Sequence, residues 1–163
     1  MYPYDFKPKR KSINNAELFV AMPFDERYDD IYTGLIEPAT AKASICLDYP
    51  EENPLKSYRT KDDIKTTSGW INILEHLMTA QIVLGVLDDN NPNVFYELGI
   101  SHATAPMTRQ ILIAHKGYEP RFNTKDLIYY EYNADKLDSC IEPLADKIED
   151  AVRSYKIEHD KRA

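Results

Sequence analysis

The sequence predicts an α/β domain with a single doubly wound, mostly parallel, five-stranded sheet and helices on both faces. Three observations support this fold class. Short apolar runs alternate along the chain with longer segments of helical period. The run "QIVLGVLDD" is continuously apolar, which is typical of a strand covered on both faces. The 163 residues suit one domain. We expect it to cover residues 16–157, between a flexible tail at 1–15 and a charged tail at 158–163.

The strands are expected where apolar residues run together between turn-forming residues. Glu17–Phe24 and Gln81–Asp88 have the most continuous apolar character, so we expect them to be adjacent central strands. The full set of expected strands is Glu17–Phe24, Ser44–Tyr49, Gln81–Asp88, Arg109–Lys116 and Leu127–Tyr132.

Helices are expected between these strands and after the last one, because apolar residues recur there at intervals of three and four. Pro38 lies inside the first helix, where we expect a kink or an early end. Residues 50–69 are polar and without periodicity, and a loop of that length in a compact domain is usually functional or mobile. The expected helices are Tyr28–Ala43, Trp70–Ala80, Asn91–Ala105 and Leu137–Tyr155.

Composition excludes several classes of function. The net charge of -7 argues against a nucleic acid polymer as partner. No apolar run is long enough to span a membrane, and the N-terminus lacks the apolar segment of a secretory signal. Cys46 and Cys140 lie far apart, as expected of free thiols in the reducing cytoplasm. No glycine-rich phosphate loop is present and the four histidines lack ligand spacing, so we expect neither a cofactor nor a metal.

The stretch "DDNNPNVFYELG" is the strongest candidate for a site. Ligands of doubly wound folds bind outside the carboxyl ends of the strands, which is where Asp88 and Asp89 follow the third strand. Asn91 suits the N-cap of the next helix. Glu97 then falls in the second turn of that helix, on a narrow polar stripe that it shares with Asn93.

Three carboxylates close together are costly unless they are solvated, paired or used. Their mutual repulsion is expected to raise the pKa of at least one of Asp88, Asp89 and Glu97. The alternative is that Glu97 is a solvated helix residue and "DDNN" a polar turn. Spacing alone leaves both interpretations open.

Several segments together resemble a known family. "FVAMPF", "SYRTKDD" and "IVLGVLDDNNPNVFYELGISHA" resemble the nucleoside 2-deoxyribosyltransferase-like superfamily, and most closely its TIR-like nucleotide-binding subset. The resemblance covers about Glu17 to Ala114. It implies a flavodoxin-like or Rossmann-like version of the doubly wound fold.

The resemblance also implies roles for individual residues. Glu97 corresponds to the nucleophile that attacks the anomeric carbon of a nucleoside or nucleotide. An aspartate before that helix, here Asp88 or Asp89, helps to hold the sugar and the base. The first loop lines the base pocket, here through Met22, Pro23 and Phe24.

The chain also departs from the family pattern. The transferases have Gly-Thr or Ser-Gly-Thr before the glutamate helix, whereas this chain has Pro-Asn-Val, which favours hydrolysis or binding over base exchange. The N-terminus of that helix, with Asn91 and Asn93, is a candidate phosphate site. Arg59 and Lys61 in the long loop are candidates for the counter-charge to a phosphate, and ordinary loop surface is the alternative for both. Asp63 in the same loop is a further candidate ligand contact.

These observations lead to three hypotheses. The first is an enzyme that cleaves an N-glycosidic bond, or transfers a ribosyl group, on a nucleoside, nucleotide or NAD-like substrate. The second is a nucleotide-binding module without turnover, and the third is an interaction domain with a vestigial pocket. The resemblance further implies a homodimer or a higher homo-oligomer.

Overall fold

The structure, a computed structural model, describes residues 14–60, 69–104, 106–121 and 125–160. Its sheet has five strands in the order β2-β1-β3-β4-β5, and every neighbouring pair is parallel. The predicted doubly wound α/β class is confirmed, with an entirely parallel sheet. The strands are β1 (Asn14–Ala21), β2 (Lys56–Tyr58), β3 (Ala80–Val86), β4 (Gln110–His115) and β5 (Tyr130–Tyr132).

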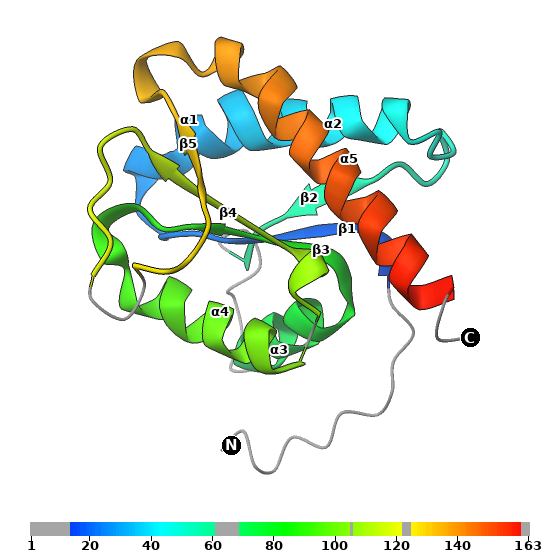
Figure 1. Cartoon of the computed structure of the whole chain (residues 1–163), viewed down its shortest axis with the longest axis horizontal. Helices are drawn as coiled ribbons and strands as arrows, with labels where there is room; N and C mark the ends of the chain where they lie inside the picture. The colour runs from blue at the N-terminus through cyan, green and yellow to red at the C-terminus, as the bar shows by residue number, and fades with distance from the viewer. Residues whose placement is uncertain (1–13, 61–68, 105, 122–124, 161–163) are drawn as a thin grey trace.

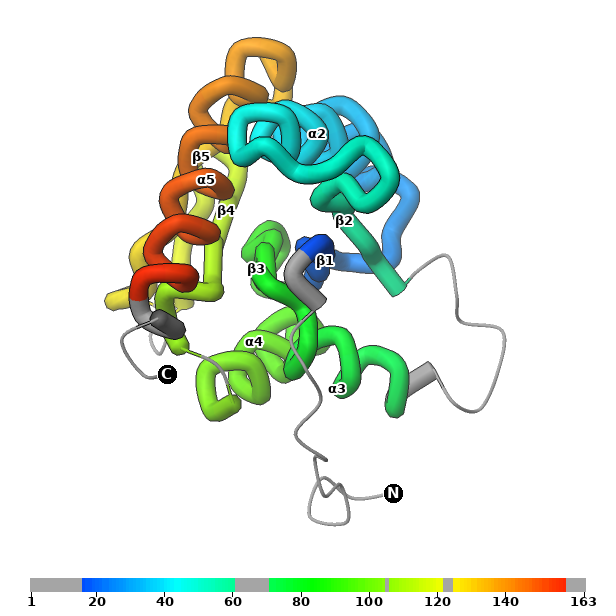
Figure 2. The backbone as a smooth tube through the Cα atoms, turned by 90° about the vertical axis from the view of Figure 1, so that its right-hand side faces the viewer, coloured from blue at the N-terminus to red at the C-terminus, as the bar shows by residue number. Residues whose placement is uncertain are grey.

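Helices cover both faces of the sheet. In Figures 1 and 2, α2 and α5 lie on one side of the strands, and α3 and α4 lie on the other. This three-layer arrangement is Rossmann-like. The helices are α1 (Asp29–Ile31), α2 (Glu37–Cys46), α3 (Gly69–Thr79), α4 (Pro92–Thr104) and α5 (Asp138–Asp160).

Strand β3 is shared by two hydrophobic cores. All seven of its residues are buried, as its continuous apolar character predicts. Leu84 and Val86 belong to the core under α2 and α5, whereas Val83 belongs to the core over α3 and α4. Strands β1 and β3 are adjacent and central, as predicted. The strand order reverses between them, because the chain goes from β1 out to β2 and then back to β3.

The predicted strand at Ser44–Tyr49 is wrong. Helix α2 continues to Cys46, and the Oγ atom of Ser44 accepts a hydrogen bond from the backbone N–H of Leu55 at 2.9 Å. Ile45, the most strand-like residue of the segment, is 77% exposed, so it does not belong to a buried strand. The second strand is instead β2, inside the segment that was expected to be a loop. Its three residues at the sheet edge are too few to show a period.

Of the kink or early helix end expected at Pro38, the early end does not occur. The helix runs through this residue to Cys46, and the irregular geometry lies upstream, in a π-helical turn at Tyr32–Ile36. There the backbone N–H of Glu37 bonds to the carbonyl of Tyr32. A π-helical turn shifts the hydrogen-bond register, so the missing N–H of the proline is accommodated without a break. The fifth strand is also shorter than predicted, because β5 begins only at Tyr130.

Candidate functional site

The candidate site lies at the carboxyl ends of β1 and β3, where the strand order reverses. Asp88–Asn90 form a short turn directly after β3. Asp89 and Asn90 have φ angles of 57° and 51°, in the left-handed region. Aspartate and asparagine tolerate this region better than other non-glycine residues, so the composition of "DDNN" fits the turn it makes. The turn sends the two neighbouring aspartates to different partners.

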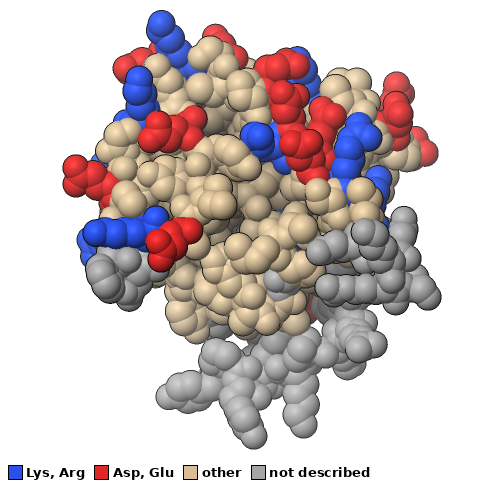
Figure 3. Space-filling view, in the orientation of Figure 1, with Lys and Arg blue, Asp and Glu red and all other residues tan. Residues whose placement is uncertain are grey.

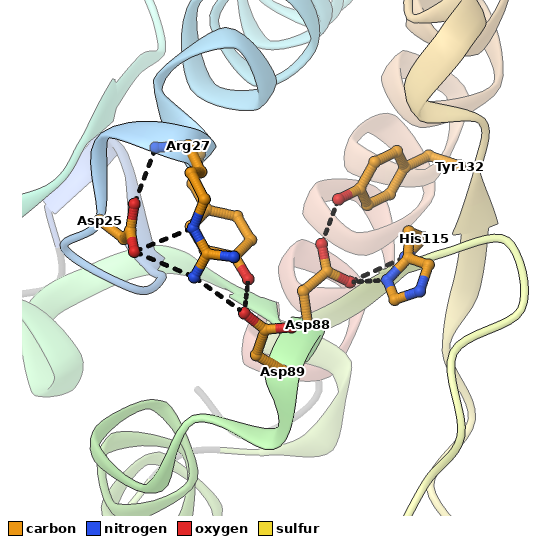
Figure 4. A network of polar contacts seen from close by, with 7 residues as sticks. Asp25, Arg27, Asp88, Asp89, His115 and Tyr132 are labelled. Atoms are coloured by element: carbon orange, nitrogen blue, oxygen red, sulfur yellow. Dashed lines mark hydrogen bonds and ion pairs between the residues drawn. The ribbon is translucent and has the colours of Figure 1, made fainter.

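Asp89 connects the loop after β3 to the loop after β1. Its carboxylate accepts hydrogen bonds from the hydroxyl of Tyr28 at 2.6 Å and from Nη2 of Arg27 at 3.2 Å. Arg27 also pairs with Asp25 at 3.0 Å, so the contacts form a chain across the reversal point (Figure 4). Burial and the bond to Asp89 raise the pKa of Tyr28, and its phenol therefore stays protonated and donates.

Asp88 is directed away from this chain of contacts (Figure 4). It is 3% exposed, and its carboxylate accepts from the backbone N–H of His115 at 2.8 Å and from Nδ1 of the same residue at 3.0 Å. The hydroxyl of Tyr132 also donates to it. Burial and the bond to Asp88 raise the pKa of Tyr132. Donors from the protein therefore surround the Asp88 carboxylate. In this position the carboxylate can hold other side chains in place.

Helix α4 begins as the sequence predicts. Oδ1 of Asn91 accepts hydrogen bonds from the backbone N–H groups of Asn93 at 2.9 Å and Val94 at 3.4 Å, which makes Asn91 the N-cap. Pro92 follows as the first helical residue and has no N–H group. A phosphate at this helix end would have to compete with the cap for the same amides, and the side chain of Asn93 is exposed.

Glu97 lies on the buried face of α4, together with Val94, Leu98 and Ser101. It is only 5% exposed, which excludes the interpretation of a solvated helix glutamate. Burial raises its pKa to about 7, so desolvation and not repulsion by the aspartates is the cause. Among the described residues, none forms a hydrogen bond or an ion pair with its carboxylate. The Oγ of Ser101, one turn further on, is fully buried and has no hydrogen-bond partner in the described part of the chain.

The remaining predicted residues are placed as follows. Met22 and Pro23 are buried directly after β1, whereas Phe24 is 41% exposed. Arg59 follows β2, and its Nη1 lies 2.7 Å from Asp29. Its guanidinium also lies over the ring of Tyr32, at 4.2 Å from the centroid. Arg59 therefore already has a structural role between β2 and α1.

Two expectations remain open at this site. Lys61 and Asp63 fall outside the described residues. That Glu97, Phe24 and the two aspartates line one cleft stays a prediction.

Sequence reasoning missed four side chains that surround the aspartates. They are Arg27, Tyr28, His115 and Tyr132. A signal was available for the last two, because His115 ends β4 and Tyr132 ends β5, and the carboxyl ends of parallel strands meet at one edge. To use that signal, one must know that β4 lies beside β3 and that β5 lies beside β4. The sequence pattern does not supply this order.

Other types of site are limited by the described residues. They contain no group of three or more histidine, cysteine or acidic residues placed to hold a metal ion. None of the helices described is long and apolar enough to cross a bilayer. On the face shown in Figure 3, basic and acidic side chains of the described residues are interspersed, without a large patch of one sign. Models of known protein families and the sequences of curated proteins were compared with the chain, and neither gave a match.

Proposed function

We propose that this protein cleaves the N-glycosidic bond of a nucleoside, nucleotide or NAD-like substrate, with Glu97 as the nucleophile. The observation that carries the proposal is the state of the Glu97 carboxylate. It is buried on α4 and has no partner among the described residues, and its helix starts at the point where strand order reverses. A buried acid without a partner costs stability, and such groups are characteristic of functional sites.

The chemistry suits a carboxylate in this state. Breaking the bond between the anomeric carbon and the base develops positive charge on the sugar, and a carboxylate beneath the ring offsets that charge or forms a ribosyl ester. Its effect is larger in a site that excludes water, because screening is weak there. With a pKa of about 7, Glu97 is partly ionised near neutral pH. The developing positive charge draws it further toward the ionised form.

The surroundings supply places for the rest of such a substrate. Open α/β sheets bind ligands in the crevice where strand order reverses, which here lies between the loops after β1 and β3. Phe24, exposed in the first of these loops, offers a ring face for stacking a base. Because the cap uses the first amides of α4, the site favours an unphosphorylated nucleoside over a nucleotide held at that helix end.

The proposal is tested by incubating the protein with a panel of nucleosides, 5′-nucleotides and NAD. Chromatography measures the free base that is released. We expect Glu97→Gln to lower the rate by about 100-fold or more, because glutamine keeps the shape but cannot ionise. The matched control is Glu37→Gln, which changes an exposed helix glutamate and should leave the rate unchanged.

Two outcomes would count against this assignment. A folded Glu97→Gln protein that works at the parent rate would show that Glu97 is not the nucleophile. A parent protein that binds members of the panel without releasing base would instead be a nucleotide-binding module.

A further inference from the structure

A histidine and a carboxylate form a fixed pair at the edge of the sheet. His115 ends β4 and Asp88 follows β3, and these strands are neighbours. Asp88 accepts from both the backbone N–H and the Nδ1 of His115, at 2.8 and 3.0 Å. Tyr132, at the end of β5, donates to the other oxygen of the same carboxylate (Figure 4). The position of the carboxylate is thereby set from two directions.

This arrangement leaves one ring nitrogen of His115 available. Because Nδ1 donates to Asp88, Nε2 is the ring nitrogen left to contact a bound molecule. No described residue bonds to Nε2, and the side chain of His115 is 42% exposed. The ring of Tyr118 meets the imidazole edge-on, with centroids 6.2 Å apart. The imidazole is therefore held on two sides while Nε2 remains accessible.

A second pair of the same kind shows what a structural histidine looks like in this protein. Nδ1 of His76, on α3, lies 2.7 Å from the carboxylate of Glu17, which is in β1. The His76 ring stacks against Tyr58 at 4.2 Å and Phe19 at 5.7 Å. It is thus enclosed in packing, whereas the ring of His115 reaches solvent beside the candidate site.

We propose that His115 is the residue that exchanges a proton with the substrate, and that Asp88 is the positioning residue that orients it. This inference rests on the proposed function and names a further group of the same site. In the first step, an oxygen of Glu97 forms a bond to the anomeric carbon while the bond to the base nitrogen breaks. The electron pair of that bond goes to the base, which takes the Nε2 proton of His115.

In the second step, water attacks the anomeric carbon of the ribosyl ester. The bond to Glu97 breaks, its electron pair returns to the carboxylate, and the proton of the water goes to Nε2 of His115. The cycle consumes one nucleoside and one water and releases free sugar and free base, so both residues return to their starting forms.

Several charged and polar groups face His115 from neighbouring elements. Asp88 faces it from the loop after β3, Tyr132 from β5 and Tyr118 from the loop after β4. Asp89 and Tyr28, on the loops beside them, bond to each other.

A pair of substrates separates proton donation from a structural role. Adenine departs from adenosine more easily when it is protonated, whereas nicotinamide departs from nicotinamide riboside as a neutral molecule and needs no proton. We expect His115→Gln to lower kcat for adenosine by about 100-fold and to change kcat for nicotinamide riboside by less than about threefold. Asp88→Asn should act in the same direction, and His76→Gln, the matched control, should affect both substrates equally.

The results that overturn the inference differ from those that overturn the proposed function. If the parent protein releases base from no member of the panel of nucleosides, 5′-nucleotides and NAD, the proposed function fails and the inference falls with it. If the parent is active and His115→Gln loses both activities equally or neither, the inference alone is wrong. If the parent cleaves nicotinamide riboside but not adenosine, the inference about His115 is also excluded. If only adenosine is cleaved, added imidazole must restore activity to His115→Ala, and absence of rescue excludes the role of His115.

Discussion

At the scale of single residues, Glu97 is predicted to cost stability. Its pKa of about 7 in the folded protein lies above the ordinary value of 4.5. The folded state is therefore relatively favoured below about pH 4.5, and this contribution is lost as the pH rises through about 7. A shift of this size corresponds to about 3 kcal/mol. Chemical denaturation should find Glu97→Gln more stable than the parent by up to that amount at about pH 8.

The pH dependence is the control for this stability prediction. The gain from Glu97→Gln should shrink toward about pH 4.5, because the parent glutamate is then protonated as well. A gain that is equal at all pH values would mean that the variant acts through packing and not through charge.

The same residue sets a prediction for activity. A nucleophilic carboxylate works in its ionised form, so kcat/KM of the parent should rise about tenfold per pH unit below about 7 and level off above it. Initial rates across this range measure the limb. Any residual activity of Glu97→Gln should lack this rise with pH. If the rise persists in the variant, it belongs to a different titrating group.

At the scale of elements, α4 owes its position to a glycine in β3. A Cβ atom built at Gly85 would lie 2.8 Å from Cδ2 of Leu98 and 3.0 Å from Cδ2 of Leu112. Gly85→Ala should therefore destabilise the protein by about 1–3 kcal/mol, because it overpacks the contact between β3 and α4. Urea unfolding measures the change. Activity should fall as well, since Glu97 moves with the helix that carries it.

Gly99 provides the matched control on α4 itself. It is exposed, and a Cβ atom there would meet nothing within 4 Å. Gly99→Ala should raise stability by up to about 1 kcal/mol, because alanine restricts the unfolded chain and favours the helix. Equal effects of the two substitutions would show that close packing at Gly85 is not the cause.

At the scale of the whole molecule, ligand binding is predicted to stabilise the fold as a unit. A nucleoside at 100 times its Kd adds about 2.7 kcal/mol to the free energy of unfolding. For a domain of this size that corresponds to a rise in Tm of about 5–11 °C. Thermal unfolding with adenosine, nicotinamide riboside and NAD as probes checks it. Glu97→Gln should keep the rise, whereas a vestigial pocket would show none with any probe.

The sequence by itself determined the elements whose pattern is long or chemically specific. The apolar runs of β1, β3 and β4 predict buried parallel strands, because a strand between two helical layers has no polar face. Asn91 followed by Pro92 predicts the start of α4, because capping depends on residues next to one another in the chain. Segments such as β2, with three residues at the sheet edge, are too short to carry such a pattern.

Only the tertiary structure decided how the acidic residues are used. Asp88 and Asp89 are neighbours in the chain, yet one bonds to His115 and the other to Tyr28. The apolar pattern predicts that β1 and β3 are adjacent, but it does not place β4 beside β3 or direct the two aspartates to partners on different elements. The pKa of Glu97 is likewise raised by burial within the packed layers. Desolvation depends on all the atoms around a carboxylate, and these are brought together only when the elements pack.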